Sequence, residues 1–190
     1  MKLLIASNNK HKVSEIKKIL SGKFDGIYSL AEIGIDADPK ETASDFLGNA
    51  RIKAHETARH TDLAVLADDS GLEVDALSGA PGVYSARYAG EPYSDERNND
   101  KLLAEMQGIQ NRQARFVTCM VLLFPTGREI VGVGEVKGEI LRERKGGNGF
   151  GYDPLFYSYE LGKTFGEATD DEKNAVSHRA RALEDLLRQL

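Results

Sequence analysis

The chain contains a single cysteine, Cys119, so no disulfide can form within it and no zinc site can be built from several thiolates. Long apolar runs are also missing. The N-terminal stretch from Met1 to Ala6 soon reaches the polar residues Asn8 and Asn9. That stretch is too short for a signal peptide, and no later run is long enough to span a bilayer. These absences predict a protein of the reducing cytoplasm with no membrane partner.

Positive charge is in deficit, since 25 lysines and arginines against 30 aspartates and glutamates give a formal net charge of −5. An acidic chain binds the phosphates of duplex nucleic acid poorly, so nucleic acid is not an expected partner and any phosphate site must be local. The 190 residues include no internal repeat and no linker that would cleanly separate two domains. With 41% hydrophobic and 29% charged residues, residues 1–190 are expected to fold as one domain.

Familiar nucleotide-binding and catalytic motifs are missing as well. No stretch matches the phosphate-binding loop G-x-x-x-x-G-K-[ST]. The nearest stretch ends in Gly162-Lys163-Thr164, but it has Tyr157 where the first glycine belongs. There is no G-x-G-x-x-G fingerprint, no H-E-x-x-H pair and no G-x-S-x-G elbow. The sites that these motifs build are therefore excluded.

Strand and helix patterns alternate in the first third of the chain. Two strands and two helices are expected there, at residues 3–6, 13–20, 46–60 and 63–67, in the order strand, helix, helix, strand. Thr42 and Asp45 have a spacing like that of a capping box, with Asp in place of the usual Glu or Gln, and open the second helix. The second strand is expected to end abruptly at residues 68–71.

A hairpin is expected in the middle of the chain. Two apolar runs at residues 114–124 and 129–136 are separated by a short turn, so the strands must be antiparallel. Ser94 or Asp95 caps a helix before the hairpin, and the apolar face of this helix carries Leu102, Leu103 and Met106. A final helix carries Val176, Ala180, Leu183, Leu186 and Leu187 on one face. Together with the earlier alternation, this pattern predicts an α/β protein with a mixed sheet and helices packed on it.

The first candidate site is the loop from Ser7 to Lys12, which leads from a strand into a helix N-terminus. Backbone N–H groups and the helix dipole favour an anion there, and Lys10 and Lys12 add cationic donors. The loop therefore indicates a phosphate site. The alternative is an ordinary capped helix with solvated lysines, and Lys53 in the next helix has the same ambiguity.

The second candidate site is the pair Asp68 and Asp69 at a strand end. Neighbouring side chains on a strand point to opposite faces, so one carboxylate is expected to brace the fold while the other enters a cleft. Glu41 is a further carboxylate beside a helix start, and Mg²⁺ is typically held by one or two carboxylates plus substrate phosphates. Glu41 and Asp69 would suffice for such a site, although an aspartate at a strand end can also be a turn former.

A glycine-rich segment at residues 147–154 combines backbone freedom with two aromatic rings, which suits close approach to a planar base. The alternative is a turn whose aromatic residues fill the core. Lys173, His178 and Arg179 bring further donors to the start of the last helix, unless they form a solvated face.

Together these segments resemble the inosine triphosphate pyrophosphatases, which remove non-canonical purine nucleotides. The matching segments, in order along the chain, are SNNKHK at 7–12, ADDSGL at 67–72, GAPGVYSARY at 79–88, GFGYDP at 149–154 and SHR at 177–179. The resemblance implies two lobes around a long mixed sheet, with the active site in the cleft between the lobes and a homodimer as the assembly. It also implies hydrolysis of ITP, dITP and XTP to the monophosphate and pyrophosphate with Mg²⁺.

Residue roles follow from the same resemblance. Glu41 and Asp69 would bind the metal, and Asp69 would also be the proton acceptor. The substrate would be bound by Ser7, Asn8, Asn9, Lys10, His11, Lys12 and Lys53 at the triphosphate, by Ser70, and at the base by Phe150, Gly151, Tyr152, Asp153, Lys173, His178 and Arg179. Two other functions stay open: a pyrophosphatase for other modified nucleotides, such as pyrimidine triphosphates, and a nucleotide-binding module without hydrolysis.

Overall fold

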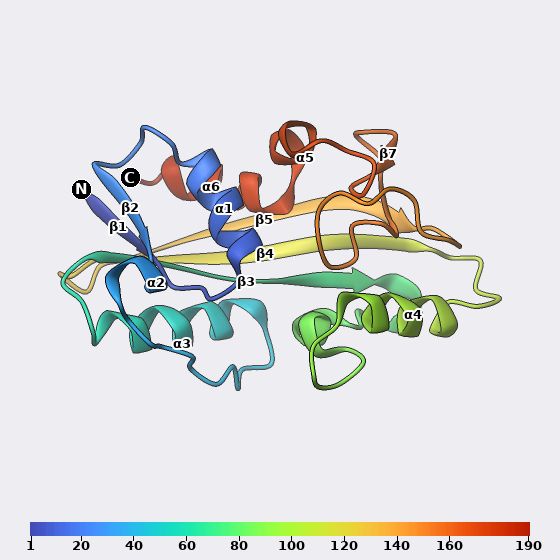
Figure 1. Cartoon of the computed structure of the whole chain (residues 1–190), viewed down its shortest axis with the longest axis horizontal. Coiled ribbons are helices and arrows are strands. Elements are labelled where there is room, and N and C mark those ends of the chain that lie inside the picture. Colours follow the sequence, from blue (N-terminus) through green and yellow to red (C-terminus); the bar gives the residue numbers. More distant parts are fainter. The chain divides into compact units, whose positions relative to one another are not determined.

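The computed structural model describes all 190 residues, and its elements are labelled in Figure 1. By internal contacts the chain divides into two compact units. Unit 1 comprises residues 1–69, 118–134 and 179–190, and unit 2 comprises residues 70–117 and 135–178. No helix is both long and apolar enough to cross a membrane.

Seven strands form one sheet in the order β2-β1-β3-β4-β5-β6-β7. The strands are β1 Lys2–Ile5, β2 Gly26–Ser29, β3 Ala64–Val74, β4 Gln113–Leu123, β5 Glu129–Ile140, β6 Phe156–Ser158 and β7 Lys163–Thr164. Strand β1 pairs in parallel with β2 and β3, whereas β6 pairs antiparallel with β5 and β7. The predicted mixed sheet of an α/β fold is therefore confirmed.

Six α-helices accompany the sheet. They are α1 Lys10–Ile19, α2 Leu30–Ile33, α3 Phe46–Ala58, α4 Asp95–Glu105, α5 Asp170–Val176 and α6 His178–Leu187, with two 3₁₀ turns at Asp75–Leu77 and Gly82–Arg87. The predicted hairpin is also confirmed, because β4 and β5 are neighbours and the Phe124 N–H donates to the Arg128 carbonyl across the turn.

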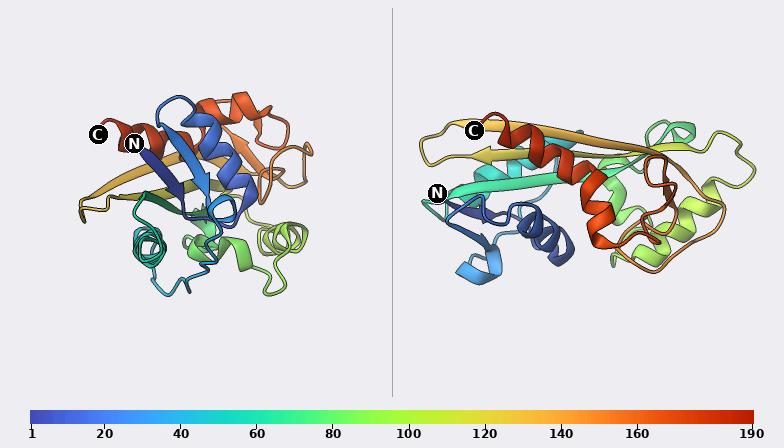
Figure 2. Two further views of the ribbon diagram at one scale, coloured as in Figure 1. Left: turned by 60° about the vertical axis from the view of Figure 1, so that its left-hand side comes forward. Right: turned by 90° about the horizontal axis from the view of Figure 1, so that it is seen from above.

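In unit 1 both faces of β1 are buried. Leu3 and Ile5 pack with Ile16 of α1 and with the apolar face of α6, whereas Leu4 packs on the other side with Ala50 of α3. Figure 2 shows α1 and α6 on one side of these strands and α3 on the other. The alternation along the strand thus decides which helix each side chain meets.

Unit 2 has a separate core with an aromatic centre. Phe116 of β4 lies with its ring centroid 4.6 Å from that of Phe156 and 6.0 Å from that of Phe165. Leu102 and Met106 of α4 are fully buried in the same cluster. The apolar face expected on this helix is therefore the face that packs, and Ser94 caps it by accepting from the Arg97 N–H.

The predicted end of the second strand at residues 68–71 is wrong, because β3 continues to Val74. Asp68 and Asp69 lie inside the strand and are 2% and 5% exposed. Carboxylates are rarely buried unless they are paired, so two successive aspartates in a sequence suggest that a buried strand has ended. Cations from distant helices pair with them here, and the strand continues.

Two helix boundaries also differ from expectation. The N-cap of α3 is Asp45, whose carboxylate accepts from the Gly48 N–H, so Thr42 is not the capping residue. The final helical stretch is two helices, because Ser177 takes an extended conformation and separates α5 from α6. Lys173 consequently belongs to α5 and not to the start of the last helix.

Candidate active site

The site of unit 1 begins where β1 stops. Ile5 is the last residue of β1 and pairs with Leu66, while the neighbouring β3 runs on through Asp68 and Asp69. The Ala6 N–H still bonds to the Leu66 carbonyl, and the chain then turns away toward α1. The two carboxylates therefore lie just beyond the carboxyl end of β1, where ligands of α/β sheets commonly bind.

Asp69 projects toward α3. Its Oδ2 accepts from Asn49 Nδ2 at 3.0 Å, and its Oδ1 lies 3.6 Å from Lys53 Nζ. The same ammonium donates to Glu41 Oε1 at 2.8 Å. Lys53 thus joins the two carboxylates that the sequence assigns to the metal. The spacing of Asn49 and Lys53 is one helical turn, which brings both side chains to the same face of α3.

Asp68 projects to the opposite face, as the strand alternation predicts. Its Oδ2 accepts from Lys12 Nζ of α1 at 2.9 Å and lies 3.9 Å from Arg179 Nε of α6. Arg179 is 1% exposed and also pairs with Glu15, one turn after Lys12. Asp68 Oδ1 is buried and makes no hydrogen bond. This carboxylate therefore braces α1 and α6 against β3.

Burial and charge shift the pKa values of this cluster in different directions. Burial raises the pKa of Asp69, and the ammoniums of Lys53 and Lys12 only partly offset that effect. Burial also opposes ionisation of Asp68, but Lys12 and Arg179 outweigh it and hold the Asp68 pKa well below its usual value. The pKa of Lys53 is raised, because the surrounding carboxylates outweigh the effect of burial. Asp69 is therefore the more basic of the two aspartates.

The loop before α1 is built differently from expectation. Asn9 caps the helix, and its Oδ1 accepts from the N–H groups of His11 and Lys12 at 3.0 and 3.2 Å. Two of the donors expected to face an anion are thus already bonded within the chain. Ser7 Oγ accepts from the Asn9 N–H, and Asn8 Nδ2 donates to the Ala37 carbonyl. Lys10 and His11 are exposed beside this capped turn.

The site residues of unit 2 surround Asp153. Asp153 Oδ2 accepts from the Phe150 N–H at 3.0 Å and from Lys173 Nζ at 2.6 Å. The Lys173 ammonium lies 4.6 Å from the centroid of the Phe150 ring, within the range of a cation–π contact. A side chain at Gly149 would collide with the Asp153 carboxylate, and the backbone there has φ +75°. Glycine is required at this position for close packing.

Tyr152 supports the core of unit 2, because the residue is 4% exposed and its hydroxyl donates to the Ser85 carbonyl at 2.7 Å. His178 is also buried and stacks on Phe116 with centroids 4.9 Å apart. A solvated face is therefore wrong for Lys173, His178 and Arg179, since all three are almost fully buried. Ser70 follows Asp69 in β3 and is partly exposed.

The pair Glu41 and Asp69 fits a divalent cation that arrives with a ligand. One ammonium, that of Lys53, already lies within 4 Å of both carboxylates, so the two can share a positive charge. No cluster of three or more His, Cys, Asp or Glu side chains that could hold a metal ion is present. Two carboxylates leave the other coordination positions to phosphate oxygens and water, which is the usual arrangement for Mg²⁺.

Comparison with known proteins assigns the chain to a family. The sequence pattern of the Ham1 family matches residues 3–189. The chain belongs to the Ham1 family. The resemblance inferred from the sequence motifs is thereby confirmed.

Relatives of this Ham1 chain match it over nearly its full length. It is 50% identical to the dITP/XTP pyrophosphatase of Clostridium perfringens, over 97% of this chain and 95% of that protein. It is 49% identical to the dITP/XTP pyrophosphatase of Lactobacillus johnsonii, over 99% of this chain and 94% of that protein. The Ham1 protein of Staphylococcus aureus shares its fold with a TM-score of 0.88 and 42% identity, covering 100% of this chain and 97% of the other.

Sequence reasoning missed two polar residues of the Ham1 site. They are Glu15 and Asn49, whereas the brace expected at the Asp68–Asp69 pair is confirmed for Asp68. Each missed residue lies on a helix turn beside a residue that was singled out: Glu15 three residues after Lys12, and Asn49 four residues before Lys53. This helical spacing is the signal that would have found them.

Proposed function

We propose that the chain, acting as one domain over residues 1–190, hydrolyses the non-canonical purine nucleotides ITP, dITP and XTP. The products are the nucleoside monophosphate and pyrophosphate, so the reaction removes such nucleotides from the pool. The observation that carries the proposal is the shared position of Glu41 and Asp69 around one cation. The names of relatives about half identical to this chain support the choice of substrate.

Residues of unit 1 bind the triphosphate and its metal. Mg²⁺ held by Glu41 and Asp69 would neutralise phosphate charge and polarise a phosphoryl oxygen. Lys10 and Lys12 donate to the phosphates, and Lys53 neutralises part of their charge. The polar side chains of the same loop complete the triphosphate site: Ser7, Asn8, Asn9 and His11.

Asp69 accepts the proton of the water that attacks the α-phosphorus. Its raised pKa makes it a stronger base than an exposed aspartate, and the Asn49 amide fixes the direction of its carboxylate. General-base catalysis of this kind contributes about 10² to 10⁴ in rate. As pyrophosphate leaves, Lys12 stabilises the charge that grows on its oxygens.

The purine is recognised by Phe150, Gly151, Tyr152 and Asp153, with Ser70, Lys173, His178 and Arg179. The Phe150 ring offers a stacking face, and the loop N–H groups, His178 and Arg179 offer donors. Hypoxanthine and xanthine present an oxygen acceptor at position six, where adenine presents an amino donor. A site built of donors therefore rejects ATP, and such rejection can reach roughly 10⁴.

The cellular location of the protein and its oligomeric state stay predictions. We expect a cytoplasmic homodimer that binds a small nucleotide and neither nucleic acid nor a membrane. Light scattering coupled to size exclusion checks the dimer, because a 20.9 kDa chain gives well-separated masses for one and two copies.

The deciding experiment is a nucleotide panel in ¹⁸O-labelled water, with monophosphate and pyrophosphate measured together. ITP, dITP and XTP should each yield both products with Mg²⁺ and neither with EDTA, and the label should enter the monophosphate. ATP, dUTP and methylated pyrimidine triphosphates are assayed as comparison substrates, and the proposed specificity predicts slow hydrolysis of each. Equal turnover of the pyrimidine nucleotides, or binding of ITP without product, would refute the proposal.

A further inference from the structure

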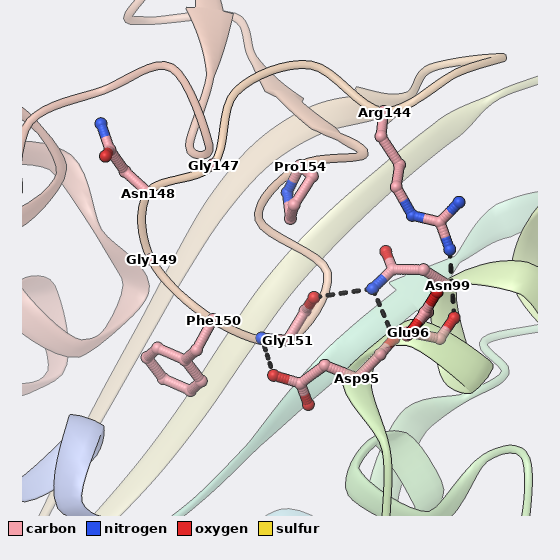
Figure 3. A pocket seen from close by; sticks show the side chains of 10 residues that line it. All are labelled: Asp95, Glu96, Asn99, Arg144, Gly147, Asn148, Gly149, Phe150, Gly151 and Pro154. Atoms are coloured by element: carbon pink, nitrogen blue, oxygen red, sulfur yellow. Dashed lines mark hydrogen bonds between the residues drawn. The ribbon is translucent and has the colours of Figure 1, made fainter.

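The segment that carries Phe150 is held from outside by helix α4. Asp95 Oδ2 accepts from the Gly151 N–H at 2.7 Å, and Asn99 Nδ2 donates to the Gly151 carbonyl at 2.8 Å. Figure 3 shows the two side chains reaching the loop from neighbouring turns of α4, with the Phe150 ring directed away from them. The same residues line a pocket of about 390 Å³ on this side of the loop.

The two bonds fix both peptide planes that flank one glycine. The Gly151 N–H belongs to the peptide that joins it to Phe150, and the Gly151 carbonyl belongs to the peptide that joins it to Tyr152. Gly151 has φ +62°, and without a side chain it has more backbone freedom than any other residue. Fixing the planes on either side removes that freedom.

The chain is held by contacts on both sides of this hinge. Tyr152 is buried and bonded through its hydroxyl to Ser85, so it does not move with the loop. Phe150 is partly buried, its N–H donates to Asp153 Oδ2 at 3.0 Å, and its ring centroid lies 4.6 Å from the Lys173 ammonium. The two hydrogen bonds at Gly151 fix the backbone between these two held residues, and together with the Asp153 and Lys173 contacts they set the direction of the Phe150 ring.

Asn99 is itself held rigidly enough to do this. It is 3% exposed, and its amide also donates to the Asp95 carbonyl at 2.6 Å within the helix. Asp95 is exposed at the first turn of α4, so its side chain makes no contribution to the apolar core. A carboxylate that accepts from a backbone N–H forms one of the stronger kinds of hydrogen bond.

We infer that Asp95 and Asn99 are positioning residues for purine recognition, acting through Gly151 on the Phe150 ring. This inference rests on the proposed function, since it takes the Phe150 segment as the base-binding segment. It assigns to α4 a part in substrate specificity that is separate from the groups that bind phosphate and metal in unit 1.

The test compares Asp95→Ala with Glu96→Ala. Both substitutions remove one exposed acid from the first turn of α4, so both lose the same favourable charge at the helix N-terminus. Of these two acids, only Asp95 bonds to the Gly151 loop through its side chain. KM and kcat for ITP are measured for each variant, together with inhibition by inorganic tripolyphosphate, which has no base.

Loss of a hydrogen bond to a charged acceptor predicts an increase of about tenfold in the KM for ITP in Asp95→Ala. The kcat and the inhibition constant of tripolyphosphate should change by less than about threefold, because uniform binding energy affects KM alone. Asp95→Asn retains an acceptor oxygen and should recover most of the affinity. Glu96→Ala should behave as the wild type.

Two outcomes overturn the inference while leaving the proposed function intact. One is an ITP KM in Asp95→Ala equal to that in Glu96→Ala, and the other is an equal loss of affinity for ITP and tripolyphosphate. Failure of the wild-type chain to release pyrophosphate from ITP would instead overturn the proposed function, and the inference with it.

Discussion

Asn49 Nδ2 donates to Asp69 Oδ2 at 3.0 Å, and both residues are almost completely buried. The other end of the Asn49 amide accepts from the Ala43 N–H at 2.9 Å, so the side chain is held from both ends. Asn49 thus orients the carboxylate that we propose as the general base. This contact connects helix α3 to the chemistry and leads to the first prediction.

Asn49→Asp should impair both activity and stability. The substitution keeps an acceptor for Ala43 but replaces the donor to Asp69 by a second carboxylate, and like charges in a buried position repel. Loss of a hydrogen bond to a charged group costs about 1.5 to 3 kcal/mol in the free energy of unfolding. Urea unfolding and pyrophosphate release from ITP measure the two effects. Wild-type values for both would show that Asn49 does not orient Asp69.

Lys53→Met should make the protein depend more strongly on Mg²⁺ for its thermal stability. Without the ammonium, Glu41 and Asp69 have no shared cation, so the metal-free variant should melt below the wild type. Added Mg²⁺ binds the folded state and restores the missing charge, so its stabilising shift should be larger than in the wild type.

Differential scanning fluorimetry with MgCl₂ or EDTA measures this shift. The matched control is Arg51→Met on the same helix, where the arginine pairs with Glu129 at the surface and contributes little. Equal Mg²⁺ shifts in Lys53→Met, Arg51→Met and the wild type would show that Glu41 and Asp69 do not bind the ion together.

Asp68→Asn should destabilise the fold near neutral pH. The substitution leaves Lys12 and the buried Arg179 without their shared counter-charge, and removal of one partner of a buried pair costs roughly 3 to 5 kcal/mol. Equilibrium unfolding in urea measures the loss of free energy. Glu32→Gln, an exposed acid of α2 paired with Lys17, provides a control with a smaller expected loss.

The same variant should also respond less to acid. The pKa of Asp68 is lowered in the folded protein, so its stabilisation is present above the unfolded pKa of about 3.9 and is lost as the pH falls toward the folded value. Asp68→Asn lacks this contribution and should show a flatter decline of stability below about pH 4. Parallel pH profiles for the two proteins would contradict the assignment.

Much of the fold can be predicted from the sequence where an apolar run or a helical spacing of apolar residues marks the element. The strand at residues 3–6, the hairpin of β4 and β5 and the helix at 13–20 are all present. The missed elements are short or half-buried: β2 has no fully buried residue, and β6 and β7 have three and two residues. Such elements form because neighbouring strands pair with them, and no local sequence pattern indicates that pairing.

The site divides in the same way. The alternation that sends Asp68 and Asp69 to opposite faces follows from strand geometry and could be predicted. The continuation of β3 could not, because it depends on cations at Lys12 and Lys53 that come from other parts of the chain. Asp95 and Asn99 lie on α4 as ordinary polar residues, and only their contacts with Gly151 reveal a role.

The dependence of pyrophosphate release from ITP on Mg²⁺ concentration tests the central claim most directly, when measured for wild type, Glu41→Gln and Asp69→Asn. Both variants should need more Mg²⁺ for half-maximal rate, and Asp69→Asn should also lose at least about a hundredfold in kcat while remaining folded. Release that persists in EDTA, or an Mg²⁺ requirement unchanged by either substitution, would contradict the account.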